Sequence, residues 1–407
     1  MKCRHCAAAL TLPFLDLGSA PPSNAYLTAA SLNAPEAWYP LRLLTCQCCW
    51  LVQTEDHAGR EALFTEDYAY FSSFSSSWLD HAKSYVADML RRFGLGAQSH
   101  VVEIAANDGY LLQYVKAAGV PCLGIEPTAS TAAAARAKGI TIDERFFGVA
   151  LGRELAAAGQ SADLMAANNV LAHVPDINDF VGGFAQLLKP QGVATFEFPH
   201  LLRMVQFCQF DTAYHEHYSY LSLTAVQRIF AANGLAVFDV QELPTHGGSL
   251  RVFAQRAETG RHMTAPAVQQ VLALEAEAGM LTAGFYSQFD QQPKRIAREL
   301  LSFLIDMAEQ GHSVAAYGAA AKGNTLCNFA GVRPHLLPYV VDRNPAKQGK
   351  FMPGSRIPIV DEAHLRAQRP SHVLILPWNL KDEVMAQLSY IREWGGRFVT
   401  AVPKLEI

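Results

Sequence analysis

The densest group of reactive side chains lies between Phe210 and Tyr220. These eleven residues contain two histidines, two carboxylates and three tyrosines. His215 and His217 are two residues apart and would face away from each other on a helix, so the segment is not the H-E-x-x-H zinc motif. On a loop, an imidazole with a pKa near neutrality could transfer a proton and tyrosine hydroxyls could stabilise an oxyanion. The segment therefore predicts acid–base chemistry, against the alternative of a tyrosine-rich turn with hydrogen-bonded histidines.

Two other segments could converge on the same pocket. Asp67–Ser73 is a second polar and aromatic cluster, which contains Tyr68 and Tyr70. His173 follows the end of a predicted strand, where functional groups gather in parallel sheets, although a purely structural role is equally open to it.

The cysteines form a different kind of pattern. Cys3 and Cys6 make one CxxC pair, and after 39 intervening residues Cys46 and Cys49 make another. Four thiolates fill the tetrahedral shell of zinc, and a closed shell predicts a structural metal site. Cys48 is an alternative ligand to Cys49, and buried free thiols are the other interpretation of the spacing.

The elements that position these groups are predicted from apolar runs. Strands are expected near residues 100–105, 122–126, 162–167 and 192–199, with helical patterns at 110–118 and 177–189 between them. This alternation predicts an α/β fold with a parallel sheet, whose ligand lies at the carboxyl ends of the strands. The residues at those ends are the predicted cofactor ligands: Glu103, Asn107, Asp108, Gly109, Glu126, Pro127, Asn168 and Asn169.

The loop after the first of these strands suggests which cofactor binds. It carries Gly109 but lacks the G-x-G-x-x-G pattern that cradles a pyrophosphate. Glu126, at the end of the second strand, is placed to accept both ribose hydroxyls. The combination disfavours NAD and favours S-adenosylmethionine, which has a ribose but no phosphates.

The last third of the chain repeats the pattern of strand, glycine turn and helix. Strands are expected near 313–317, 336–341, 372–377 and 398–402, which predicts a second Rossmann-like sheet with Lys322 at a turn where it could neutralise a phosphate. Residues 268–309 have the pattern of a helical connector. Just before it, Gly247, Gly248, Ser249 and Arg251 predict a phosphate or sugar contact, with a simple hairpin turn as the alternative.

Composition limits the class of protein. Of 407 residues, 50% are hydrophobic and 17% charged, and the formal net charge is −4. These values indicate packed domains and argue against nucleic-acid binding. The sequence shows neither a secretory signal at its start nor the ~18–20 residue apolar run of a membrane span, so we expect a cytoplasmic protein.

Taken together, these segments resemble the sugar C-methyltransferases that act on nucleotide-linked 4-keto deoxysugars. The resemblance covers nearly the whole chain and implies a zinc module (1–65), an S-adenosylmethionine domain (66–240), a linker and helical connector (241–300) and a Rossmann-like sugar-nucleotide domain (301–407). It implies that His217 removes the proton next to the 4-keto group, with Glu216, Tyr214, His173 and a tyrosine of the Tyr68/Tyr70 pair around the sugar. In the carboxyl-terminal domain the resemblance implies that Tyr317, Lys322 and Asn324 bind the substrate.

Two other functions remain open from the sequence. One is an NAD-dependent nucleotide-sugar oxidoreductase with two Rossmann halves, which the single glycine argues against. The other is a zinc-stabilised nucleotide-sugar binding protein without turnover. The sequence leaves open the methylated carbon, the nucleotide, and whether the protein is a monomer or a dimer.

Overall fold

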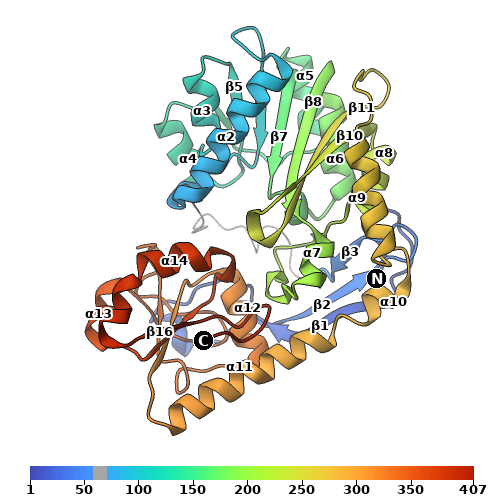
Figure 1. Ribbon diagram of the computed structural model, residues 1–407. Helices are drawn as coiled ribbons and strands as arrows, with labels where there is room; N and C mark the ends of the chain where they lie inside the picture. Colours follow the sequence, from blue (N-terminus) through green and yellow to red (C-terminus); the bar gives the residue numbers. More distant parts are fainter. Residues whose placement is uncertain (58–70) are drawn as a thin grey trace.

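The computed structural model describes residues 1–57 and 71–407 and contains three β-sheets (Figure 1). The amino-terminal sheet is antiparallel, in the order β1 (Leu12–Ala20), β2 (Tyr39–Thr45), β3 (Val52–Thr54) and β9 (Ser219–Tyr220). Its last strand comes from the histidine-rich segment more than 160 residues further along the chain. The amino-terminal module and the predicted catalytic segment therefore share one sheet.

The central sheet has seven strands. Their order is β10 (Leu235–Leu243), β11 (Ser249–Arg256), β8 (Leu188–Pro199), β7 (Ala162–Asn168), β4 (Val101–Ile104), β5 (Cys122–Ile125) and β6 (Ile142–Asp143). The strands from β8 to β6 are parallel, whereas β11 is antiparallel to both of its neighbours. This order, with one antiparallel strand next to the edge, is that of class I methyltransferases.

Helices cover both faces of the central sheet (Figure 1). Val101 packs toward one face and Val102 toward the other, as alternating side chains of a strand must. The first face is covered by α2 (Ser76–Phe93), α3 (Leu112–Ala117) and α4 (Ala129–Ala137). The second is covered by α5 (Val149–Ala157), α6 (Ile177–Leu187), α8 (Leu223–Ala232) and α9 (Pro266–Glu277). Burial on both faces explains the continuous apolar runs of these strands.

The carboxyl-terminal sheet is the predicted second Rossmann-like sheet. Its five parallel strands run in the order β14 (Ile359–Val360), β13 (Val340–Val341), β12 (Val314–Tyr317), β15 (His372–Ile375) and β16 (Arg397–Val399). One face packs on α11 (Gln291–Glu309) and α12 (Ala321–Ala330), and the other on α13 (Glu362–Gln368) and α14 (Lys381–Gln387). The first face continues into the amino-terminal module, because Phe14 stacks on Phe289 with ring centroids 4.8 Å apart.

The connector is helical, as the pattern at 268–309 indicates, and consists of α9, α10 (Ala283–Ser287) and α11. The expected boundary at residue 240 divides a hydrogen-bonded sheet, because β11 lies between β8 and β10. Strand β11 was not predicted from the sequence because Arg251 and Gln255 interrupt its apolar run, although both side chains are buried. The central sheet thus extends to Arg256, and its last two strands form a hairpin around the predicted glycine turn.

Among the described residues, no helix combines the length and the hydropathy that crossing a membrane requires.

Candidate active site

Two histidines from distant segments lie next to each other. His217 lies in the loop between a 3-10 turn at Phe210–Thr212 and β9, and His173 ends a 3-10 turn that follows β7. Their ring centroids are 4.5 Å apart, and Nδ1 of His173 lies 2.9 Å from the carbonyl oxygen of Glu216. The structure thus brings together two residues that the sequence separates by more than forty positions.

The hydrogen bonds of His217 define its proton-accepting atom. Nδ1 of His217 lies 2.9 Å from the carbonyl oxygen of Thr212, and a carbonyl only accepts, so Nδ1 carries the proton and Nε2 the lone pair. Burial, together with the neighbouring His173, lowers the pKa of His217 well below its usual value. Burial also lowers the pKa of His173 to about 4. Both rings are therefore neutral at pH 7, the state that a general base requires.

Tyr214 and Glu216 lie beside this pair. The ring centroid of Tyr214 is 4.0 Å from that of His217. One carboxylate oxygen of Glu216 accepts hydrogen bonds from Asn24, at 3.3 Å from the backbone nitrogen and 3.2 Å from Nδ2. Burial raises the pKa of Glu216. Asn24 was missed because it lies in a polar loop between β1 and β2 without any motif.

His215 points the opposite way. Its Nε2 lies 3.3 Å and 3.2 Å from the carbonyl oxygens of Tyr39 and Pro40, so it ties the loop to β2. Tyr68 and Tyr70, the remaining predicted catalytic residues, lie outside the described residues.

Lys322 enters the site from the start of α12. Its ammonium lies 4.5 Å from the ring centroid of Trp378 and donates to Asn379 at 2.7 Å. The indole nitrogen of Trp378 donates to Asp211 at 2.7 Å. Burial raises the pKa of Asp211 to about 6, although the charge of Lys322 opposes the shift. Sequence reasoning missed Trp378 and Asn379, which follow the strand β15 in the same way that Lys322 follows β12.

The two other predicted residues of the carboxyl-terminal domain are placed differently. Asn324 is fully buried next to Lys322 and donates to the carbonyl oxygen of Ser23 at 2.6 Å, whereas its side-chain oxygen has no partner among the described residues. Tyr317 packs on the opposite face of the sheet, and its hydroxyl accepts a 2.6 Å hydrogen bond from Gln387. The structure thus brings Lys322 and Asn324 together but directs Tyr317 elsewhere.

The predicted cofactor residues converge at the carboxyl ends of β4, β5 and β7. Glu126 accepts hydrogen bonds from the backbone nitrogens of Asn107 and Thr128, both at 2.9 Å. Asn107 has a positive φ of 48°, and a Cβ on Gly109 would lie 2.4 Å from Ile140. The loop is therefore held in one strained conformation around the carboxylate.

The remaining members of this group surround that loop. The carboxylate of Asp108 forms a salt bridge with the ammonium of Lys138, at 3.3 Å. Glu103 is buried, and this burial is the main reason that its pKa lies well above its usual value. Pro127 follows Glu126 in the turn before α4. At the end of β7, the side-chain oxygens of Asn168 and Asn169 are buried without a partner among the described residues. A carboxylate and two acceptors without partners fit the hydroxyl and amino groups of an adenosyl ligand.

Arg251 is held inside the protein by an acid that the sequence did not single out. Its guanidinium donates to Glu197 at 2.8 Å, and the same carboxylate oxygen lies 2.9 Å from Nε2 of His81. Burial favours the neutral acid, but His81 and Arg251 together hold the pKa of Glu197 below its usual value. Thr245 donates to the other oxygen of Glu197 at 3.0 Å. Arg251 thus anchors the glycine turn.

The glycine turn itself is the hairpin between β10 and β11, the alternative that the sequence left open. Gly247 and Gly248 have φ values of 85° and 116°. A Cβ on Gly247 would lie 2.4 Å from Gln209 and 2.6 Å from Trp378. Ser249 donates to the carbonyl oxygen of Thr245 at 2.9 Å. The turn therefore packs closely against the carboxyl-terminal domain.

The four predicted metal ligands also converge. The sulfur atoms of Cys3, Cys6, Cys46 and Cys49 all lie within 4.8 Å of one another, whereas Cys48 is exposed and outside this group. Four convergent thiols with no open position fit a structural zinc ion.

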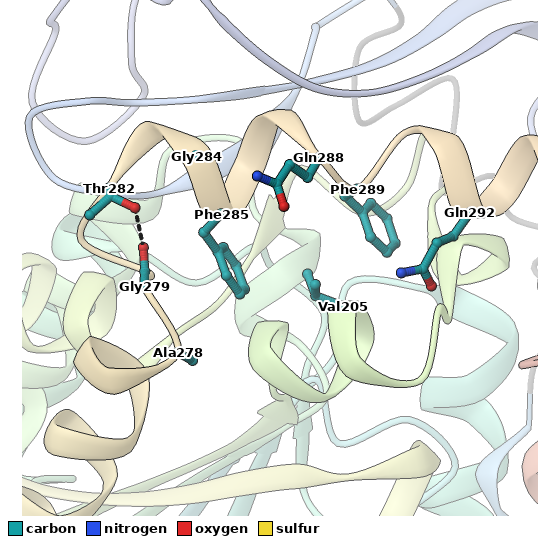
Figure 2. A pocket seen from close by; sticks show the side chains of 9 residues that line it. All are labelled: Val205, Ala278, Gly279, Thr282, Gly284, Phe285, Gln288, Phe289 and Gln292. Atoms are coloured by element: carbon teal, nitrogen blue, oxygen red, sulfur yellow. Dashed lines mark hydrogen bonds between the residues drawn. The ribbon is translucent and has the colours of Figure 1, made fainter.

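A surface groove of about 390 Å³ lies between α7 (Leu201–Gln206) and the connector helices α10 and α11 (Figure 2). Val205, Phe285 and Phe289 project into it, and glutamine side chains lie along its rim. None of its lining residues is charged and none belongs to the predicted site, so the groove has no part in the chemistry described above.

Three family models match consecutive parts of the chain. Residues 3–64 match a family described as "Putative zinc binding domain", residues 78–240 match "Methyltransferase domain", and residues 244–403 match "C-methyltransferase C-terminal domain". Among solved structures, magnesium protoporphyrin IX methyltransferase from Synechocystis PCC 6803 with bound SAM is 17% identical, with 44% of this chain and 79% of that chain covered and a TM-score of 0.34. A S-adenosylmethionine-dependent methyltransferase from Mesorhizobium loti is 19% identical, with 44% and 100% covered and a TM-score of 0.35.

A curated relative matches over the full length. C-methyltransferase NovU from Streptomyces niveus is 32% identical over 403 residues, which cover 99% of this chain and 96% of the relative. Together with the class I topology and the four-cysteine cluster, this match identifies an S-adenosylmethionine-dependent enzyme with an amino-terminal zinc-binding module. The chain therefore belongs to the C-methyltransferase family.

Proposed function

We propose that the protein methylates the carbon next to the 4-keto group of a nucleotide-linked deoxysugar. The observation that carries the proposal is the neutral His217, whose bond from Nδ1 leaves Nε2 as the basic atom and whose ring centroid lies 4.5 Å from that of His173 and 4.0 Å from that of Tyr214. A C–H bond beside a ketone needs a base of this kind, because its proton is only weakly acidic in water.

His217 begins the reaction. Its Nε2 takes the proton, the C–H electron pair moves into a carbon–carbon double bond, and the carbonyl electrons move to oxygen. A hydrogen bond from a hydroxyl such as that of Tyr214 stabilises the enolate oxygen, and His217 later releases its proton to solvent. Bound S-adenosylmethionine would supply an electrophilic methyl group for the enolate carbon, and a neutral thioether would be its leaving group. Glu126, Asn168 and Asn169 are the proposed ligands of its adenosyl part.

The carboxyl-terminal domain is proposed to hold the nucleotide. Lys322 is a half-buried cation that acts electrostatically on His217 and lies over Trp378, which follows a strand of that domain's sheet, so a diphosphate could meet it there. Asn324 and the glycine turn at Gly247 and Gly248 lie around the same place. We accordingly assign zinc binding to residues 1–65, S-adenosylmethionine binding to 66–240, the linker and helical connector to 241–300 and sugar-nucleotide binding to 301–407. The central sheet itself extends to Arg256.

The test combines methyl transfer with proton exchange. The protein is incubated with methyl-labelled S-adenosylmethionine and a panel of nucleotide 4-keto sugars, and deuterium uptake from solvent is followed at the carbons beside the ketone. We expect transfer to one sugar, and His217→Gln to reduce both exchange and transfer by about 10²- to 10⁴-fold, the usual contribution of a general base. His335→Gln, on the exposed surface, is the matched control.

Retention of wild-type exchange and transfer in His217→Gln would rule out His217 as the base. Methylation of none of the keto sugars, by protein that still binds S-adenosylhomocysteine, would refute the proposed substrate class.

A further inference from the structure

Arg4 connects the cysteine cluster to both histidine loops. It lies between the ligands Cys3 and Cys6, and its side chain is only 5% exposed. One terminal nitrogen donates to the carbonyl oxygen of Pro175 at 2.8 Å, two residues after His173. The guanidinium also lies 5.3 Å from the ring centroid of Tyr218, next to His217. A residue of the cysteine knuckle therefore contacts the neighbours of both histidines.

Thr54 makes the more direct connection. Its hydroxyl donates to the carbonyl oxygen of His217 at 2.6 Å. Its backbone nitrogen donates to the carbonyl oxygen of Tyr218 at 3.2 Å. Both bonds extend the pairing of β3 with β9, in which Gln53 lies opposite Ser219. Thr54 is 1% exposed, so water does not replace these bonds. Arg4 also donates to the carbonyl oxygen of Thr54, at 3.0 Å.

Gln53 links this strand to a metal ligand. Its side-chain nitrogen lies 3.3 Å from the sulfur of Cys3, and its side-chain oxygen accepts a 2.9 Å hydrogen bond from the backbone nitrogen of Arg4. On the other side of the knuckle, Asn178 at the start of α6 lies 2.8 Å from both Nδ1 and the carbonyl oxygen of His5. The conformation of the knuckle and the position of β3 are thus fixed by the same set of bonds.

We propose that Arg4 and Thr54 are positioning residues, through which the zinc module sets the place of His217 and His173. This inference rests on the proposed function, because it takes His217 as the base. Misplacing a reacting group by about 1 Å can cost ~10²-fold in rate, so two bonds to the loop backbone are enough to matter. Zinc in the cluster would hold the knuckle, and through it Arg4, in one conformation.

The first experiment removes one hydroxyl. Thr54→Val keeps the shape of the side chain but loses the bond to His217, so we expect kcat to fall by about 10- to 100-fold while the Kd of S-adenosylhomocysteine stays unchanged. Thr54→Ser restores the hydroxyl and should recover kcat to within about 3-fold of wild type. Thr259→Val is the matched control, because its hydroxyl also donates to a backbone carbonyl, that of Pro190, at 2.7 Å on the surface.

The second measurement does not depend on activity. Deuterium uptake by backbone amides is compared in wild type, Thr54→Val, Arg4→Met and zinc-depleted protein, with zinc content measured in each. We expect faster uptake in residues 171–175 and 210–220 in all three altered proteins, and unchanged uptake in the strands of the carboxyl-terminal sheet.

The proposal is overturned if Thr54→Val keeps wild-type kcat and wild-type uptake at 210–220. It is also overturned if zinc depletion loosens residues 1–57 and leaves 210–220 unchanged, or if all segments loosen equally. If His217→Gln proves fully active, the proposed base is wrong, yet the uptake comparison still tests whether the module holds this loop.

Discussion

The central and carboxyl-terminal sheets place an acid at the same point. Glu126 follows β5 and accepts from the backbone nitrogens of Asn107 and Thr128. Asp342 follows β13 and accepts from those of Ala319 and Asn344, both at 2.8 Å. In each case one donor lies in the loop after the neighbouring strand and the other lies two residues beyond the acid. The two edges therefore share one local geometry.

They differ in what surrounds the acid. Lys347 lies 3.6 Å from Asp342 and donates to the carbonyl oxygen of Ala319 at 2.8 Å, and the hydroxyl of Tyr26 donates to the same carbonyl at 2.6 Å. Among the described residues, no cation forms a salt bridge with Glu126. The acid of the carboxyl-terminal sheet is thus covered by side chains of the protein itself, including one from the amino-terminal module, whereas Glu126 keeps its remaining lone pairs for a ligand. Similar sheet ends can therefore have different uses.

The largest expected effect comes from making the same change at both acids. Glu126→Gln removes a negative charge that fixes the loop and would accept the ribose hydroxyls, so we expect the Kd of S-adenosylhomocysteine to rise by about 10- to 100-fold, as for loss of a charged hydrogen-bond acceptor. Asp342→Asn should leave this Kd unchanged. Titration calorimetry measures both, and equal losses of affinity would show that the two edges are not distinguished as proposed.

A medium effect is expected from the substitution Lys322→Met, because Lys322 is the residue through which the carboxyl-terminal domain affects the proposed base. Burial sets the low pKa of His217, and the positive charge of Lys322 lowers it further. A base must be deprotonated to act, so activity should fall only as the pH drops below the folded-state pKa, which lies below the ordinary ~6.5.

In Lys322→Met the cation is absent, so protonation of His217 is easier, its pKa rises, and the acid limb of kcat/KM moves to higher pH. The pH–rate profiles of wild type and variant measure this shift. An unchanged acid limb would mean that the edge contributes binding alone, which KM would then report.

Much of this arrangement could be predicted from local pattern. Apolar runs that end in an acid indicated both sheets and Glu126, and repeated CxxC spacing indicated a cysteine cluster that the structure shows. Each of these signals depends on residues near one another in the sequence.

What could not be predicted depends on contacts between distant segments. Asn24 reaches Glu216 across 192 residues, and Trp378 reaches Asp211 across 167. The buried pairing of Arg251 was missed for the same reason, since its partner Glu197 becomes visible only when β11 pairs with β8. The local sequence alone does not distinguish an arginine that is exposed from one that is buried and paired with an acid.

The smallest expected effect tests whether Lys347 only closes its edge. Lys347→Met removes the ammonium group, which lies 3.6 Å from Asp342 and 5.2 Å from the ring centroid of Tyr26. A partly exposed ion pair contributes about 1 kcal/mol or less, so we expect Tm to fall by about 2 °C, with an unchanged Kd for S-adenosylhomocysteine. Thermal unfolding and calorimetry measure the two quantities. If the substitution instead made the carboxyl-terminal edge bind a second equivalent of adenosyl ligand, the acid there would be equivalent to Glu126, and Lys347 alone would separate the two edges.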